Sequence, residues 1–233
     1  MEVIYLWKKK YISAFLCACS LSLFYFPNPV SAAVASTATS SATVTFTPGT
    51  EPSSPVDPDD PSKPLDPPGQ GTGEAGPLSI DYVPKITFGS QSISSSQKVY
   101  NLTELKPFVQ VTDIRGTGAG WNVIAKASAF NDGTADSLKG STISLKGGYT
   151  LSANPSATKP TASNPVVLTT DNTESTVMVA AENSGLGTWI DKWYPTETTA
   201  TSNDNVTLTV PAGSATANTH TSTITWTLAD API

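Results

Sequence analysis

Short segments of alternating apolar and polar residues, separated by turn residues, fill the sequence from Gly76 to its end. Alternate residues of a strand point to the same face of a sheet, so this pattern predicts strands with one buried face. No segment in this region keeps the period of an amphipathic helix. The expected strands are 78–83, 108–112, 121–130, 141–145, 166–168, 176–180, 206–210 and 221–228. We therefore expect one all-β domain, a single sandwich or barrel without internal repeats.

A further strand is expected at Ala42–Thr47, where apolar residues alternate with threonine, after a flexible N-terminus at 33–41. Eight prolines and four aspartates lie between Pro48 and Pro68, and glycines follow up to Gly76. Proline lacks the N–H that helices and sheets need. Residues 48–76 are therefore expected to form a long, extended Pro/Asp-rich loop after the first strand, interrupting a domain at 42–233.

The N-terminal 32 residues are typical of a signal peptide. Three lysines at positions 8–10 precede an apolar stretch, 11–26, that is too short for a comfortable membrane span. Val30-Ser31-Ala32 is a small-residue cleavage site, so we expect a secreted protein that begins at Ala33. The alternative is a lipoprotein acylated at Cys19, but the apolar stretch continues past this cysteine.

Cleavage would remove both cysteines of the chain, leaving no disulfide, thiolate nucleophile or thiolate metal site. It would also reduce the 13 basic and 19 acidic residues to 10 and 18, a net charge of −8. This acidic balance argues against nucleic acid as a partner, because phosphate binding relies on lysine and arginine.

Two passages resemble the motifs of the WxL domain family of Gram-positive bacteria. Residues 111–123 (VTDIRGTGAGWNV) resemble the proximal motif, and 224–232 (ITWTLADAP) resemble the distal one. The passages 76–82, 86–89 and 185–189 and the Asp-Pro linker support this resemblance. Val123 replaces the leucine of the first motif, and His220 replaces the family's usual tyrosine before the second.

The resemblance implies a cell-surface protein that binds peptidoglycan without a covalent anchor. Its implied partners are a membrane-anchored WxL-interacting protein and other WxL proteins. An adhesin that binds host matrix proteins, or a structural component of a surface complex, is the alternative function. The chain ends without a sorting motif or an apolar tail, and this fits the implied non-covalent attachment.

The motif tryptophans lie on apolar strand faces. Trp226 shares a face with Ile224 and Leu228, opposite a row of threonines, and Trp121 shares a face with Val123. We expect both tryptophans to be buried in the core, and direct contact with a ligand is the alternative.

Trp189, Trp193 and Tyr194 are the candidate ligand-binding residues. Their segment, 185–195, is bounded by glycine and proline and lacks strand alternation, which predicts a loop. Aromatic rings on such a loop suit sugar stacking. The alternative is a loop whose rings cap one end of the sandwich.

No residue pattern indicates an enzyme, a cofactor or a metal centre. His220 is the only histidine, and Asp132 with Asp136 is the closest carboxylate pair, in a segment that reads as a turn. Calcium binding at such Asn/Asp-rich turns is an open alternative, although they lack an EF-hand pattern. Gly116, Gly118 and Gly120 precede a strand and not a helix, so we expect a turn, with an Asp113–Arg115 ion pair.

Overall fold

The computed structural model describes residues 34–154, 157–195 and 201–232, so the predicted leader and its cleavage site lie outside the described residues. The described part contains strands and no helix, which confirms the all-β prediction. None of it is a helix long and apolar enough to cross a membrane. The chain divides into two units, Met1–Val44 and Thr45–Ile233, and all described strands belong to the second.

Each of the eight strands expected after Gly76 is present, with its ends shifted by a few residues, and 121–130 is split in two. In chain order the strands are β1 (Leu78–Tyr82), β2 (Lys98–Leu102), β3 (Phe108–Asp113), β4 (Trp121–Ala127), β5 (Phe130–Asn131), β6 (Asp136–Ser137), β7 (Thr142–Leu145), β8 (Tyr149–Leu151), β9 (Thr161–Ala162), β10 (Val166–Thr169), β11 (Ser175–Ala180), β12 (Gly187–Lys192), β13 (Asn203–Val210) and β14 (Ile224–Ala229).

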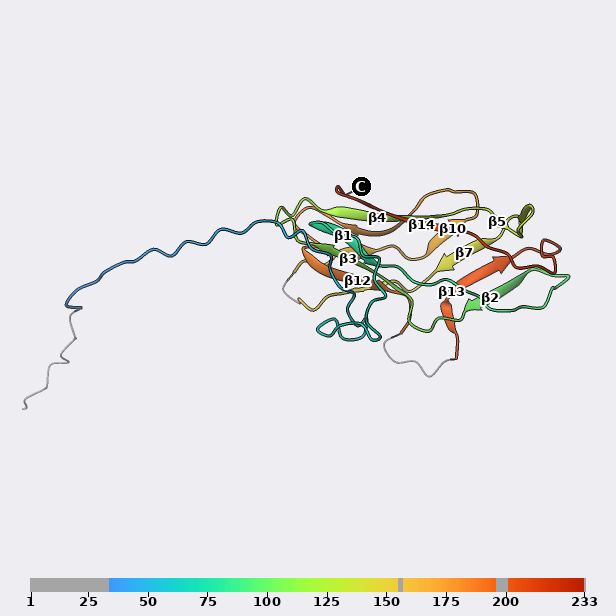
Figure 1. The fold of residues 1–233 in the computed structure, drawn as a ribbon, viewed down its shortest axis with the longest axis horizontal. Helices are drawn as coiled ribbons and strands as arrows, with labels where there is room; N and C mark the ends of the chain where they lie inside the picture. The colour runs from blue at the N-terminus through green and yellow to red at the C-terminus, as the bar shows by residue number, and fades with distance from the viewer. Residues whose placement is uncertain (1–33, 155–156, 196–200, 233) are drawn as a thin grey trace, which may run out of the picture. The chain divides into compact units, whose positions relative to one another are not determined.

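Three antiparallel sheets make up the second unit, beside the short β5–β6 pair. Sheet 1 has the order β1-β3-β12-β8, sheet 2 the order β10-β7-β13-β2, and sheet 3 the order β14-β4-β11-β9. Figure 1 shows β1, β3 and β12 toward one end of this unit and β2, β7 and β13 toward the other. The outer strands β1 and β14 are edges of sheets 1 and 3.

One hydrophobic core is shared by the three sheets. Sheet 1 contributes Val109 and Val111, sheet 2 contributes Ile143 and Leu145, and sheet 3 contributes Val123, each at most 1% exposed. In each strand the core residues are two apart, as the pleat of a strand requires. The alternation in the sequence therefore marks the faces that the sheets bury.

The Pro/Asp-rich segment folds back onto the outer face of sheet 1. The side-chain amide of Gln110 holds it: Oε1 accepts from the Val56 N–H at 2.8 Å, and Nε2 donates to the Ser54 carbonyl at 3.2 Å. Val56 also packs against a small cluster that contains Phe108 and Ile190. The expectation of an extended excursion is wrong, because polar and apolar partners on the sheet hold the segment down.

Asp59 fixes the same segment by charge. Its carboxylate accepts from Lys106 Nζ at 2.6 Å and from Lys192 Nζ at 3.0 Å. The Lys192 side chain is only 3% exposed, so this ion pair is shielded from water on one side. The segment therefore forms a cover over sheet 1.

The strand expected at Ala42–Thr47 is not formed. Residues 34–50 have no strand, and Val44 and Phe46 are 73% and 87% exposed. The alternation is present in the sequence, but a strand also needs a neighbour to pair with its backbone.

A buried carboxyl group lies on β12. Asp191 is fully buried, and apart from a weak contact with the Tyr149 N–H its carboxylate has no hydrogen-bond partner among the described residues. Burial raises the pKa of Asp191 well above its usual range, because the charged form loses its water. A neutral carboxylic acid at this position is therefore favoured in the folded protein.

We expect Asp191→Asn to make the protein more stable than the wild type near pH 7, with the gap closing toward pH 4. Folded Asp191 holds its proton at pH values where the unfolded chain has lost it, so this group makes stability fall as pH rises above about 4. The amide cannot ionise. Melting temperatures from pH 4 to 8 test this, with the exposed Asp136→Asn as the control. Parallel curves for wild type and Asp191→Asn would contradict the prediction.

Candidate functional site

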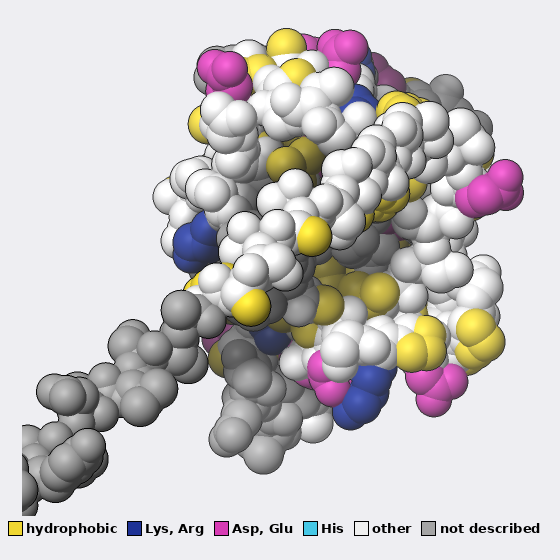
Figure 2. Space-filling view, turned by 90° about the vertical axis from the view of Figure 1, so that its left-hand side faces the viewer, with side chains coloured by type: hydrophobic (Ala, Val, Ile, Leu, Met, Phe, Trp, Pro, Cys, Tyr) yellow, Lys and Arg dark blue, Asp and Glu magenta, His cyan; other side chains and the backbone are white. Residues whose placement is uncertain are grey.

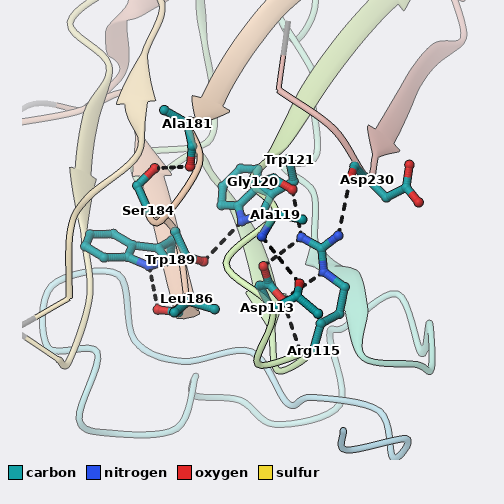
Figure 3. A network of polar contacts seen from close by, with 12 residues as sticks. Asp113, Arg115, Ala119, Gly120, Trp121, Ala181, Ser184, Leu186, Trp189 and Asp230 are labelled. Carbon is teal, nitrogen blue, oxygen red and sulfur yellow. Dashed lines mark hydrogen bonds and ion pairs between the residues drawn. The ribbon is translucent and has the colours of Figure 1, made fainter.

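Trp121 begins β4 and is completely buried, as the sequence predicts. Its indole Nε1 donates to the carbonyl of Gly185 at 3.1 Å (Figure 3). A Cβ on Gly185 would lie 2.6 Å from this nitrogen, and Gly185 has a φ of +73°, so only glycine fits here. The Trp121 ring therefore lies in the core and has no exposed surface.

The turn between β3 and β4 is held by Arg115. Its Nε and Nη2 atoms donate to the two oxygens of Asp113 at 3.0 and 2.8 Å, and Nη2 also donates to the Gly120 carbonyl at 2.7 Å. The Asp113 side chain is fully buried. The ion pair expected from the sequence is present. Its bidentate, buried geometry makes it stronger than an exposed ion pair.

Arg115 also connects the two motifs. Its Nη1 atom donates to the Asp230 carbonyl at 3.3 Å, beyond the end of β14 (Figure 3). The side chain of Asn122 adds a second link, donating to the Ala231 carbonyl at 2.6 Å. The proximal and distal passages are thus adjacent in space.

The strands of the two passages are paired along their length. In the antiparallel ladder of β4 and β14, Trp226 faces Ala125 and Leu228 faces Val123. The small alanine leaves room for the indole ring across the ladder.

Trp226 packs against the core but is only half-buried, so it is less enclosed than the sequence predicts. Its ring lies 6.0 Å from that of Trp193, centroid to centroid, at a tilt of 35°. The other side of β14 carries the exposed threonines Thr225 and Thr227, as the alternation predicts. Trp226 faces inward, but the sheet ends beside it because β14 is an edge strand.

An open groove of about 900 Å³ runs between β1 and β14. Ile224, Trp226 and Leu228 line one side, and Leu78 and Ile80 line the other. We call it the β1–β14 groove. Hydrophobic side chains are visible inside a hollow of the domain in Figure 2. Inner-face residues of sheets 1 and 3 are reachable here because neither edge is covered by a further strand.

The segment 185–195 is a strand and not the expected loop. Residues 187–192 form β12 between β3 and β8, and Trp189, Trp193 and Tyr194 are 3%, 0% and 3% exposed. The Trp189 indole N–H donates to the Leu186 carbonyl at 3.0 Å. The expectation of solvent-exposed rings is therefore wrong, and ligand contact by Trp189 and Trp193 stays a prediction without support from their positions.

Tyr194 borders a second, smaller pocket of about 340 Å³, which we call the Tyr149 pocket. Tyr149, at the start of β8, is 56% exposed, and the Nζ of Lys159 lies 5.9 Å from the centroid of its ring. Asn205 lines the same pocket, and no described hydrogen bond uses its side-chain amide. A flat ring beside an amide is suited to a sugar, whose C–H face stacks while its hydroxyls bond.

Tyr194, in the wall of the Tyr149 pocket, is held by polar contacts. The Tyr194 hydroxyl donates to Asp59 at 3.0 Å, and Lys192 Nζ lies 4.6 Å from the centroid of the Tyr194 ring. Burial, with the neighbouring Asp59, raises the pKa of Tyr194, so its hydroxyl stays protonated. The Pro/Asp-rich segment thus supports this pocket through Asp59.

The remaining candidates of the sequence have local structural contacts. His220 contacts Ser137 Oγ at 2.8 Å and the Thr216 carbonyl at 3.0 Å through its two ring nitrogens. Asp132 accepts from backbone N–H groups of its own turn, including that of Ala135 at 3.0 Å. Among the described residues no three metal-binding side chains come together.

The sequence profile of one protein family matches residues 33–232, almost the whole chain, and its description is WxL domain surface cell wall-binding. The chain belongs to the WxL domain family. No curated protein and no solved structure matches it. As a WxL domain it is a cell wall-binding surface protein, and the two passages that resemble the family's motifs contain the paired strands β4 and β14.

Sequence reasoning missed Tyr149 in this WxL domain. Its segment, Gly147-Gly148-Tyr149, is a double glycine followed by an aromatic residue. Such a pattern indicates a tight turn that presents a ring at the start of a strand. The segment 185–195 contains three aromatic residues, so it was the stronger candidate on sequence grounds.

We expect Trp121→Ala to cost about 3–5 kcal/mol of unfolding free energy, because a fully buried ring would leave a cavity. Trp226→Ala should cost less, about 1–3 kcal/mol, because its ring is half-buried beside an open groove. Denaturant unfolding of both variants gives the comparison. An equal loss at the two positions would show that the groove is closed in solution.

Proposed function

We propose that this WxL domain is secreted and attaches without a covalent bond to peptidoglycan, and that the Tyr149 pocket receives the glycan. The exposed ring of Tyr149 beside the Asn205 amide, which has no hydrogen-bond partner among the described residues, is the observation that carries this assignment. Membership of a cell wall-binding family supports the wall as the target. The domain binds the wall and does not cleave it.

The larger β1–β14 groove suits a different ligand. Its lining is a row of aliphatic residues beside the free backbone of an edge strand. Such a surface matches an extended polypeptide better than a sugar, which needs polar side chains for its hydroxyls. The Tyr149 pocket has those groups, and its size is at the lower end of the usual range for small-ligand sites.

Charge restricts how the wall is held. With a predicted net charge of −8, the chain is repelled over long distances by the phosphates of teichoic acids. Affinity must then come from stacking, hydrogen bonds and buried apolar area. Peptidoglycan, whose glycan carries ring faces and hydroxyls, offers such contacts at close range.

We expect Tyr149→Ala to weaken binding to purified sacculi by about tenfold or more while leaving the melting curve almost unchanged, because an exposed ring contributes to binding and little to the core. Tyr149→Phe keeps the ring and should bind nearly as well as the wild type. The exposed Val99→Ala on β2 is the control. Sedimentation isotherms at several sacculus concentrations give the affinities. If Tyr149→Ala bound sacculi with wild-type affinity, the Tyr149 pocket would not be the glycan site.

We expect removal of teichoic acids to leave binding unchanged or improve it. Moderate salt should do the same, since it screens repulsion over a Debye length of about 8 Å. Lowering the pH toward 4.7, the isoelectric point of the full sequence, should strengthen binding. The test is sedimentation with intact and stripped sacculi at two ionic strengths. A collapse of binding in moderate salt, or on stripped walls, would identify an electrostatic receptor instead.

A further inference from the structure

β14 has one free edge. It pairs only with β4, through an antiparallel ladder that uses alternate backbone groups of each strand. The N–H and C=O groups of the other residues point away from β4, toward the groove. Among the described residues they have no backbone partner. A free edge of this kind is a template for one more strand.

The edge of β1 that faces the groove already has hydrogen-bond partners. Thr72 N–H donates to the Asp81 carbonyl at 2.8 Å, and the Thr72 hydroxyl donates to the Ile80 carbonyl at 2.5 Å. An added strand would therefore pair with β14, and its inward side chains would fill the space toward Leu78 and Ile80. The site requires a short segment with apolar residues at alternate positions.

The chain contains one such segment without a partner. In Ala42–Thr47 the apolar side chains Ala42, Val44 and Phe46 alternate with threonines, and every residue from 41 to 48 is exposed. The segment has six residues, as β14 does, and Pro48 ends it because proline has no N–H to donate. It carries no charge, which avoids repulsion by Glu74 and Asp230 at the rim of the groove.

We infer that residues 42–47 of one copy of the chain add to β14 in the β1–β14 groove of a second copy, with Val44 and Phe46 beside Trp226. The pairing completes the edge of sheet 3 by strand addition, in which backbone bonds supply affinity and alternate side chains supply specificity. It also buries the two most exposed large apolar residues of the segment, which water otherwise surrounds.

The geometry makes this contact head-to-tail. The donating segment and the accepting groove are different surfaces of the chain, so each copy that gives a segment leaves its own groove free for another. Contacts of this type continue into linear assemblies unless they close into a ring. The inference is independent of the glycan site, because the Tyr149 pocket shares no residue with the groove.

Sedimentation velocity of the protein beginning at Ala33, over a range of concentrations, tests the inference. We expect the wild type to form a concentration-dependent series of oligomers. Val44→Asp with Phe46→Asp should weaken self-association by about tenfold or more, because two apolar anchors become charged. The matched control is Thr43→Asp with Thr45→Asp, which adds the same charge on the opposite face of the segment and should still assemble. All four positions are exposed, so folding is not at risk.

A second measurement identifies the partner surface. A photo-crosslinking residue in place of Phe46, in a mixture of unlabelled and ¹⁵N-labelled protein, should give mixed-isotope crosslinks to residues 78–83 or 224–230. Tyr149→Ala should assemble like the wild type, whatever its affinity for sacculi. A monomer at all concentrations, equal loss in both double variants, or crosslinks within single chains only would each overturn the inference.

Discussion

The antiparallel pairing of β4 with β14 is the contact on which the rest of the domain depends. It joins segments as far apart as Asn122 and Ala231, which are 109 residues apart in sequence and linked by a hydrogen bond. The pairing places Arg115 where it can reach both the turn before Trp121 and the end of β14. It also sets Trp226 at the edge of the sheet, and this position creates the β1–β14 groove. The family's two motifs are thus two halves of one structural element.

Alternation in the sequence predicted strands well where one face of a strand meets the core and the other meets water. β14 is such a strand: Trp226 and its neighbours face inward, and Thr225 and Thr227 face solvent. β12 was missed because both of its faces are covered, one by the core and the other by the Pro/Asp-rich segment. Its buried Asp191 and Lys192 hide the strand from a search for polar and apolar periods.

The candidate site shows the same limit. The burial of Trp121 followed from its neighbours on β4, whereas the half-burial of Trp226 depends on which strand ends the sheet, and no local pattern encodes that. Ala42–Thr47 shows the converse case, a good strand pattern with no neighbour in the structure. Tyr149 became a candidate only when β8, β12 and β13 were seen to meet around it. Pairing partners depend on the whole chain. The sequence of one segment therefore predicts which face of a strand is buried better than it predicts which strand ends a sheet and leaves a groove open.

The distance in sequence between β4 and β14 also bears on the time course of folding. A ladder between such distant segments cannot form until the intervening chain is present, and contacts of this range make folding slow. Until then, Val123 and Ala125 lack their neighbours on one side, and the partial sheet exposes apolar surface to proteases and aggregation. A chain cut before Ile224 would lack this ladder, and the edge of β4 would keep its apolar surface exposed.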